Sequence, residues 1–255
     1  MGFLLDIKKL TKSFGGLAAV TDFDYRVKKD SIFSIIGPNG AGKTTVFNMI
    51  TGFYKPDGGT ILFEGQELSS LQPYEVTRIG IARTFQNIRL FTEMTVLENL
   101  IVSRQCRARA TLFGAMVKTP FVKQEEITHK KKLLDLLEFF NLGDKQNYKA
   151  SALAYGEQRR LEIARALACE PKFLLLDEPT AGMNPRESEN IMELISQVIK
   201  MGVTILLIEH NMNVVMEISE RIAVLDHGVK IAEGTPKEIQ TNDAVIKAYL
   251  GEISF

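Results

Sequence analysis

A glycine-rich run that ends in lysine and threonine is the first group of residues whose types and spacing could do chemistry. It reads GPNGAGKTT over residues 37–45 and directly follows an apolar run at 31–36. The pattern G-x-x-x-x-G-K-[ST] between a strand and a helix favours a loop whose backbone N–H groups point at phosphate oxygens. Glycines permit the tight turn, and the following helix start adds the positive end of its dipole. These residues predict a polyanion site.

Each polar side chain of this loop has a role in such a site. Lys43 is expected to neutralise the β- and γ-phosphates of ATP, and the Thr44 hydroxyl to coordinate Mg²⁺, because that ion prefers oxygen ligands. Thr45 is a further phosphate donor. The predicted ATP-binding residues of the loop are Gly37, Pro38, Asn39, Gly40, Ala41, Gly42, Lys43, Thr44 and Thr45.

Two adjacent carboxylates, Asp177 and Glu178, follow the apolar run at 173–176. Ligand chemistry in α/β sheets gathers at strand ends, and alternation along a strand sends neighbouring side chains in different directions. We therefore expect Asp177 to complete the Mg²⁺ site and Glu178 to polarise a water for in-line attack on the γ-phosphate. An exposed acidic turn is the alternative for this pair alone, and the upstream phosphate loop favours the functional interpretation.

The whole composition is that of a globular chain. It has 255 residues, 45% hydrophobic and 24% charged, with 31 basic and 31 acidic side chains. Its longest apolar runs, at 173–176 and 203–208, are far shorter than the roughly 18 residues of a membrane span. Zero net charge gives no global attraction to nucleic acid. Residues 1–9 lack a signal-peptide core, and the isolated Cys106 and Cys169 suit plain thiols, so we expect a cytosolic protein.

Hydrophobic periodicity divides the chain into three stretches. Residues 1–86 are β-rich and carry the phosphate loop, about 87–156 form a helical part, and 157–255 alternate helices with apolar strands. Alternation of this kind predicts an α/β fold with a parallel sheet covered by helices. The expected strands are at 3–7, 18–27, 31–36, 60–63, 173–176 and 203–208.

A third motif, LAYGEQRR at 153–160, opens a helix just upstream of the acidic strand. With the phosphate loop and Asp177-Glu178, it makes the chain resemble the ATP-binding subunits of ABC transporters, whose signature is LSGGQ-like. The resemblance runs nearly end to end. It implies one ABC ATPase domain over 1–255, with a P-loop core and mixed sheet, an antiparallel β subdomain and an α-helical subdomain. It also implies a Mg²⁺-dependent ATPase coupled to transmembrane transport.

The resemblance assigns further site residues. Phe14 stands where an aromatic ring stacks on adenine, Gln86 matches the glutamine loop as a metal ligand and catalytic residue, and His210 matches the catalytic switch histidine. The loop at 181–184 stands where the two sites of a dimer are joined. The signature residues that would contact the partner's ATP are Ala154, Tyr155, Gly156, Glu157 and Gln158.

Two positions depart from the family pattern. Ala154 stands in place of the usual serine, which removes one hydroxyl donor to the γ-phosphate. Asn184 stands in place of the usual aspartate, and with Pro185 and Glu187 it predicts an N-terminal cap for a helix over 185–200. Both departures leave nucleotide binding intact, and we expect them to weaken contact between identical subunits.

Within the family, the segments 80–91, 161–166, 181–185 and 208–212 most resemble the ATPase of branched-chain amino-acid importers. The resemblance implies separate membrane permeases, a second ATPase in a heterodimer or homodimer, and indirectly a binding protein, at the cytoplasmic face of the plasma membrane. The alternatives are the ATPase of lipopolysaccharide export, which shares the ending at 249–252, and a soluble ABC ATPase that acts on nucleic acid. Only the basic runs at 104–109 and 130–132 favour nucleic acid, and solvated helix faces explain them, so no nucleic-acid partner is expected.

Overall fold

The computed structural model describes residues 2–104 and 120–250. Cys106 and most of the basic run at 104–109 lie outside the described residues. The chain forms two compact units, one made of Met1–Gln86 with Lys172–Phe255 and the other of Asn87–Pro171. The sequence expectation ended the helical part near residue 156, and the structure extends it to Pro171 because the helix over Tyr155–Leu167 packs against the other helices of that unit.

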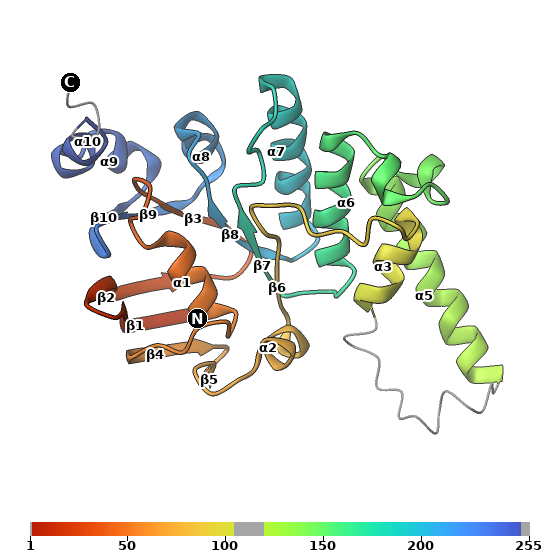
Figure 1. Ribbon diagram of the computed structural model, residues 1–255, viewed down its shortest axis with the longest axis horizontal. Coiled ribbons are helices and arrows are strands. Elements are labelled where there is room, and N and C mark those ends of the chain that lie inside the picture. Colours follow the sequence, from red (N-terminus) through yellow and green to blue (C-terminus); the bar gives the residue numbers. More distant parts are fainter. Residues whose placement is uncertain (1, 105–119, 251–255) are drawn as a thin grey trace. The chain divides into compact units, whose positions relative to one another are not determined.

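An antiparallel sheet with the strand order β2-β1-β4-β5 forms one layer of the first unit (Figure 1). Strand β1 runs to Phe14, well beyond the expected end at Ile7. The alternation of buried and exposed residues breaks after Ile7. The register shifts between Ile7 and Leu10, and Lys9 adopts a positive φ of 47° within that segment. The strands are β1 (Leu5–Phe14), β2 (Leu17–Val27), β4 (Gly58–Phe63) and β5 (Gln66–Glu67).

A six-stranded mixed sheet with the order β10-β9-β3-β8-β7-β6 forms the second layer. The strands β3, β7 and β8 are buried at every position, as continuous apolar runs predict for the middle of a parallel sheet. At one edge, β9 and β10 pair antiparallel across the turn at His227 and Gly228. The strands are β3 (Ile32–Ile36), β6 (Ile81–Arg83), β7 (Phe173–Asp177), β8 (Thr204–Ile208), β9 (Arg221–Asp226) and β10 (Val229–Gly234).

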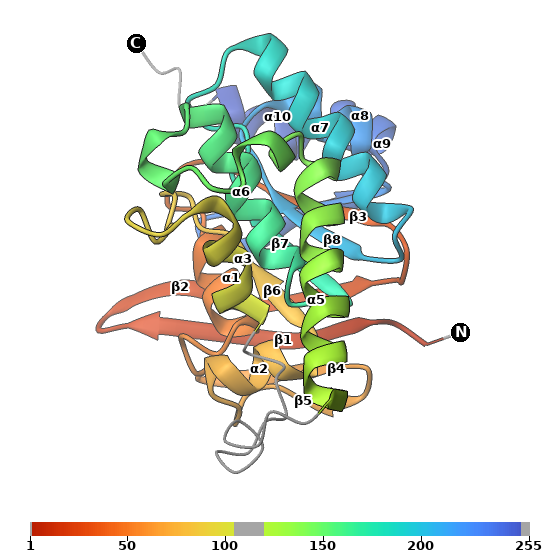
Figure 2. The same cartoon turned by 90° about the vertical axis from the view of Figure 1, so that its right-hand side faces the viewer.

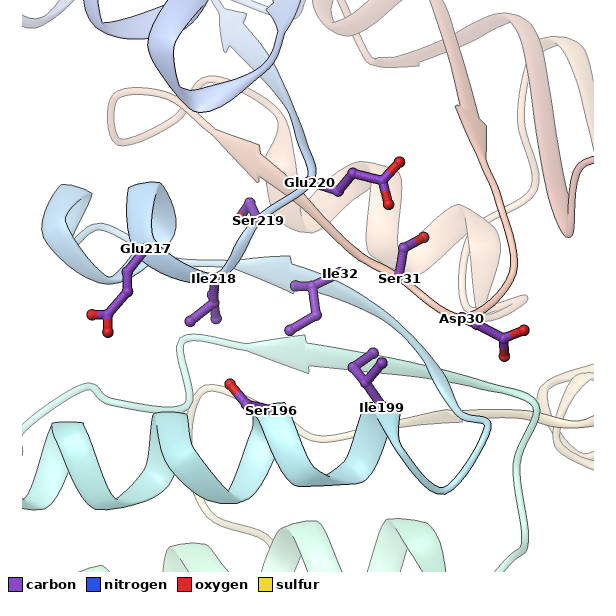
Figure 3. Close-up of a pocket in the computed structure, with 9 residues that line it drawn as sticks. All are labelled: Asp30, Ser31, Ile32, Ser196, Ile199, Glu217, Ile218, Ser219 and Glu220. Carbon is purple, nitrogen blue, oxygen red and sulfur yellow. The ribbon is translucent and has the colours of Figure 1, made fainter.

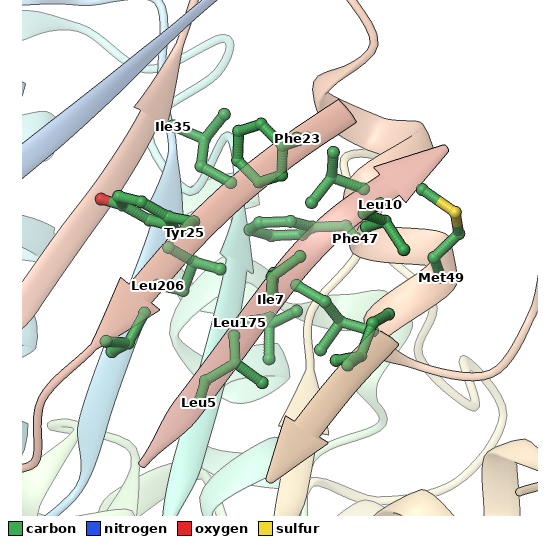
Figure 4. Packing of buried hydrophobic residues seen from close by; sticks show 14 of the residues in the cluster. Leu5, Ile7, Leu10, Phe23, Tyr25, Ile35, Phe47, Met49, Leu175 and Leu206 are labelled. Atoms are coloured by element: carbon green, nitrogen blue, oxygen red, sulfur yellow. The ribbon is translucent and has the colours of Figure 1, made fainter. Parts of the chain in front are cut away.

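The main hydrophobic core lies between these two sheets. Phe23 and Tyr25 of β2 face Leu175 of β7 and Leu206 of β8, and Phe47 lies among them (Figure 4). Phe47 belongs to α1 (Lys43–Ile50), the helix that begins at the phosphate loop. The core therefore fixes the start of α1 against both sheets, and this fixes the loop.

The remaining helices of this unit bury one face each. In α7, Ile191, Leu194, Ile195 and Val198 recur at helical spacing and are buried, so this helix is amphipathic. The short helices after β8 and β10 pack together around Val215, Ile239 and Val245. The helices are α2 (Pro73–Ile79), α7 (Pro185–Ile199), α8 (Met212–Ile218), α9 (Pro236–Gln240) and α10 (Asp243–Leu250).

The second unit is helical in its described part, as expected for this stretch. Three helices, α3, α5 and α6, pack against one another (Figure 2). Asn99 of α3 is fully buried, and its side chain bonds to both the N–H and the C=O of Phe91, which fixes the segment before the helix. The elements are α3 (Val96–Arg104), α5 (Pro120–Phe139), η2 (Gly143–Lys145), η3 (Ala150–Ala152) and α6 (Tyr155–Leu167).

None of the helices in the described residues is long and apolar enough to cross a membrane.

Candidate functional site

The phosphate loop lies between β3 and α1, in the strand–loop–helix context that the sequence predicted. Two of its glycines are required by space as well as by backbone angle. At Gly37 (φ 148°) a Cβ atom would lie 2.0 Å from the Leu225 carbonyl oxygen, and at Gly42 (φ 103°) it would lie 2.4 Å from the Ala19 carbonyl oxygen. The loop therefore runs directly against the backbones of β9 and β2, where no larger residue fits.

Lys43 is buried at the start of α1, and its ammonium group returns over the loop. Its Nζ atom donates to the carbonyl oxygens of Gly37 and Pro38, at 2.7 and 2.8 Å. The next residue, Thr44, is exposed, and Thr45 is half-buried. A fixed cation beside the N–H groups of a helix start is the arrangement that binds a chain of phosphates.

The two carboxylates at the end of β7 point in different directions, as alternation predicts. Asp177 is buried, and its Oδ2 atom accepts a hydrogen bond of 2.7 Å from the Nη2 atom of Arg83. Burial raises the pKa of the Asp177 carboxyl above its usual value, and the charges of Arg83 and, more weakly, Lys43 draw it back down.

Glu178 takes a different set of partners. Its Oε1 atom lies 2.7 Å from Nε2 of His210, and its Oε2 atom accepts a hydrogen bond of 2.8 Å from Nε2 of Gln86. Its backbone has a positive φ of 49°, unusual for a residue other than glycine, and its N–H donates to the Ile208 carbonyl oxygen. The structure thus brings together three residues that the sequence singled out at widely separated positions.

Phe14 ends β1 and is 44% exposed. Its ring meets that of Tyr54 edge-to-face with centroids 5.2 Å apart, and the Lys12 ammonium lies 5.5 Å from its centroid. Phe14 is therefore an accessible aromatic surface with a second ring beside it.

The signature motif begins α6 in the helical unit. Ala154 occupies the N-cap position, and its backbone N–H donates to the Glu157 carboxylate at 3.2 Å. The reciprocal bond of a capping box is missing because alanine has no side-chain oxygen. Tyr155 is exposed, and Gly156 and Gln158 are half-buried, with the Gln158 amide bound to the Leu153 carbonyl oxygen.

The predicted cap of α7 is confirmed. The Asn184 Oδ1 atom accepts from the Glu187 N–H at 3.0 Å, and the Glu187 carboxylate accepts from the Asn184 N–H at 3.1 Å. Pro185 holds the first helical position. The loop at 181–184 therefore ends in a complete capping box.

Sequence reasoning missed three residues of this region. Arg83 contacts Asp177, and its guanidinium also bonds to the Asn48 side chain of α1 at 2.6 Å. Tyr54 borders Phe14. Glu209, within the IEH segment, is a buried carboxylate. The sequence feature that could have indicated Arg83 and Glu209 is a charged residue at the end of an apolar strand. Strand order alone decides which partners these two residues contact.

A cavity of about 460 Å³ lies elsewhere in this unit (Figure 3). It is lined by Ser31 and Ile32 at the start of β3, whereas the phosphate loop follows the end of that strand. Its lining carries Asp30, Glu217 and Glu220 and no basic side chain. This negative, distant cavity is unsuited to phosphate and does not belong to the predicted site.

A phosphate loop with a buried lysine, together with a carboxylate pair at the end of a buried strand, defines a P-loop nucleoside triphosphatase. Residues 20–181 match the family model described as ABC transporter, and residues 229–253 match that of the branched-chain amino acid ATP-binding cassette transporter. The chain belongs to the ABC transporter family, whose ATPases couple ATP hydrolysis to transport.

Known relatives match this chain over nearly its whole length. The high-affinity branched-chain amino acid transport ATP-binding protein LivG of Escherichia coli is 48% identical over 98% of both chains. BraF of Pseudomonas aeruginosa, which has the same description, is 46% identical over 98% of both. A crystal structure of the ADP conformation of an ATP-binding cassette of an ABC transporter has 33% identity and a TM-score of 0.85, covering 98% of this chain and 100% of that one.

Proposed function

We propose that this chain is the ATP-hydrolysing subunit that drives import of branched-chain amino acids through separate membrane permeases. The observation that carries the catalytic part is the Glu178 carboxylate, which is held between His210 and Gln86. The substrate is proposed from the relatives LivG and BraF, which are described as ATP-binding proteins of high-affinity branched-chain amino acid transport. The chain then works as a peripheral subunit at the cytoplasmic face of the plasma membrane.

ATP binding is assigned to residues around the phosphate loop. The loop N–H groups of residues 37–45 and the Lys43 ammonium take the phosphate chain, with Thr45 as a further donor. The exposed ring of Phe14 stacks on adenine, and Tyr54 supports that ring from the side. Replacement of Phe14 by alanine should therefore weaken ATP binding while leaving inorganic triphosphate binding unchanged.

The donor set fits Mg²⁺. Thr44 offers a hydroxyl, Gln86 an amide oxygen and Asp177 a carboxylate, and hard cations prefer such oxygen ligands. Bound Mg²⁺ would neutralise charge on the β- and γ-phosphates. The ion pair with Arg83 restricts the orientation of the Asp177 carboxylate.

In the proposed reaction, water attacks the γ-phosphorus, the bond to the β–γ bridging oxygen breaks, and ADP and inorganic phosphate leave. Glu178 orients the water and accepts its proton. His210 and Gln86 contact opposite oxygens of that carboxylate, so each restricts its rotation. Orientation of the base, rather than new covalent chemistry, is the contribution of these residues.

The segment after Gln86 is proposed to dock a cytoplasmic loop of a permease. Phe91 and Met94 are 46% and 37% exposed, and Leu90 is half-buried. Because Asn99 fixes the backbone at Phe91, these apolar side chains form a stable surface. Phe91→Glu and Met94→Glu should each prevent co-purification with the permeases while ATP binding is kept. Intact assembly and transport in both variants would reduce the segment to ordinary surface.

A second ATPase is proposed to complete the site, because the N-terminus of α6 is a positive helix end that a partner's ATP would neutralise. Ala154 lacks the serine hydroxyl and Asn184 lacks the carboxylate of the family pattern, so we expect weak self-pairing and a heterodimer. Sedimentation of Glu178→Gln with ATP tests this. A variant that stays monomeric alone and dimerises only with the partner ATPase supports the heterodimer. A tight homodimer of the variant, with full activity of the wild-type chain alone, contradicts it.

Transport itself is tested in vesicles. The chain, its candidate permeases, partner ATPase and binding protein are reconstituted, and ATP-driven uptake of labelled leucine, isoleucine and valine is measured. Uptake in the wild type and its loss in Glu178→Gln is the expected result. Extraction of lipopolysaccharide in place of uptake would favour the export system considered from the sequence.

A further inference from the structure

Glu209, directly after β8, carries a carboxylate that the proposed reaction does not use. The residue is only 3% exposed. Within the part of the chain that the structure describes, it forms no ion pair with a basic side chain. Burial of an ionised carboxylate is costly unless hydrogen bonds replace its water. The donors that surround Glu209 therefore explain why it is there.

Three donors surround this carboxylate. The Oε1 atom accepts from the Thr180 N–H at 2.9 Å and from the Thr180 hydroxyl at 2.6 Å. The Oε2 atom accepts from the backbone N–H of His210 at 3.1 Å. One side chain thus connects the turn after β7 with His210, the second residue after β8.

These bonds close a ring around the proposed catalytic pair. Thr180 follows Glu178 by two residues, and the His210 ring contacts the Glu178 carboxylate. The Glu178 N–H also bonds to Ile208, the last residue of β8. The distance between the backbone of His210 and the turn that carries Glu178 is therefore fixed on one side by the strand backbone and on the other by Glu209.

We propose that Glu209 is a positioning residue that places the His210 ring on the Glu178 carboxylate. It acts only through backbone and Thr180 contacts and takes no part in proton transfer. The inference rests on the proposed function, in which Glu178 and His210 act in hydrolysis. Glutamate suits the position because both of its oxygens accept, and all of its neighbours here donate.

The substitutions follow from this donor pattern. Glu209→Gln keeps the size of the side chain but puts an NH₂ group against either the Thr180 donors or the His210 N–H. The hydrogen bonds on one of these two sides must therefore be lost. Thr180→Val removes only the hydroxyl bond, at nearly equal volume. Thr180→Ser keeps the hydroxyl and is the matched control.

The His210 ring provides a readout that is independent of activity. The chain has three histidines, so ¹⁵N-histidine NMR of the full chain gives few ring signals, and His129→Gln and His227→Gln assign the remaining one. Glu178→Ala gives the reference for a broken pair. Glu209→Gln and Thr180→Val should move the His210 ring signals toward that reference, and Thr180→Ser should not.

Turnover in the assembled transporter is the second measurement. We expect Glu209→Gln to lower kcat about 10- to 100-fold, with KM for ATP within about twofold, because orientation is lost and binding is kept. Wild-type ring signals and kcat in Glu209→Gln would overturn the proposal. If that variant does not fold, wild-type signals in Thr180→Val overturn it. A wild-type complex without ATPase activity would instead contradict the proposed function.

Discussion

His210 and Glu178, 32 positions apart in the chain, meet with Nε2 and Oε1 at 2.7 Å. Gln86 reaches the other oxygen of the same carboxylate from 92 positions away. The proposed base is therefore held on both oxygens. Because the side chain of this base is already ordered, it can orient a water without a further loss of its own conformational entropy.

Glu178→Gln should bind ATP with near-normal affinity and lose turnover. The amide keeps the size and hydrogen-bonding reach of the side chain but cannot accept the proton, so we expect a loss of about 10²- to 10⁴-fold in kcat. Binding of a fluorescent ATP analogue and phosphate release by the assembled complex measure the two effects. Wild-type hydrolysis in this variant would exclude the role of general base.

Lys43→Ala should weaken nucleotide binding by about 10- to 100-fold, since a charge-assisted hydrogen bond to phosphate is lost. Lys28→Ala, at an exposed lysine that precedes β3 whereas the loop follows this strand, is the control and should bind normally. Titration with ATP and with ADP in the presence of Mg²⁺ gives the measurement. Equal affinities in wild type and Lys43→Ala would overturn the assignment of the loop.

Gly42→Ala should prevent the loop from forming as observed. Its φ of 103° strains any L-residue, and the added Cβ would approach the Ala19 carbonyl oxygen to 2.4 Å. We expect a loss of about 3 kcal/mol in the free energy of unfolding, with loss of ATP binding. Gly16→Ala, where no atom lies within 4 Å and φ is not positive, is the control. Wild-type stability in Gly42→Ala would contradict this close approach.

Arg83→Met should destabilise the chain in a pH-dependent way. It leaves Asp177 buried without its cation, which costs about 3 kcal/mol in the free energy of unfolding near neutral pH. Burial already raises the pKa of Asp177 in the folded state above its unfolded value, and loss of Arg83 raises this pKa further. Stability is therefore lost as pH rises through that folded-state pKa and recovered on acidification.

Urea denaturation of Arg83→Met at a series of pH values measures this dependence. The difference from wild type should be largest at neutral pH and should shrink as Asp177 becomes protonated. Arg26→Met breaks a surface ion pair with Asp6 and removes the guanidinium from the Phe3 ring, and it should change stability by less than about 0.5 kcal/mol. A difference that is independent of pH would contradict the role of the Asp177 charge.

Caps offer a paired test of helix starts. Asn184→Ala removes the acceptor for the Glu187 N–H and should cost about 1 kcal/mol, whereas Ala154→Ser supplies the missing acceptor at α6 and should gain about as much. Chemical denaturation measures both. Ala154→Ser should also strengthen self-association with ATP if the absent hydroxyl weakens pairing. No change in either direction would contradict the capping argument.

The sequence by itself determined the local parts of this protein. The phosphate loop, the buried strands β3, β7 and β8, and the cap at Asn184 depend on residues within a few positions of one another, where periodicity and side-chain chemistry act. The different directions of Asp177 and Glu178 also follow from alternation along one strand. The local pattern predicted too early an end for β1, because a bulge near Lys9 interrupts the alternation of buried and exposed residues.

Only the tertiary structure decided which distant side chains meet. The sheet places β7 between β8 and β6, so the residue after β7 lies within reach of His210 on one side and of the segment after β6 on the other. The same order brings Arg83 to Asp177 and Glu209 to Thr180. Strand order is set by packing over the whole core, which no local pattern encodes, so these partnerships could not be read from the sequence.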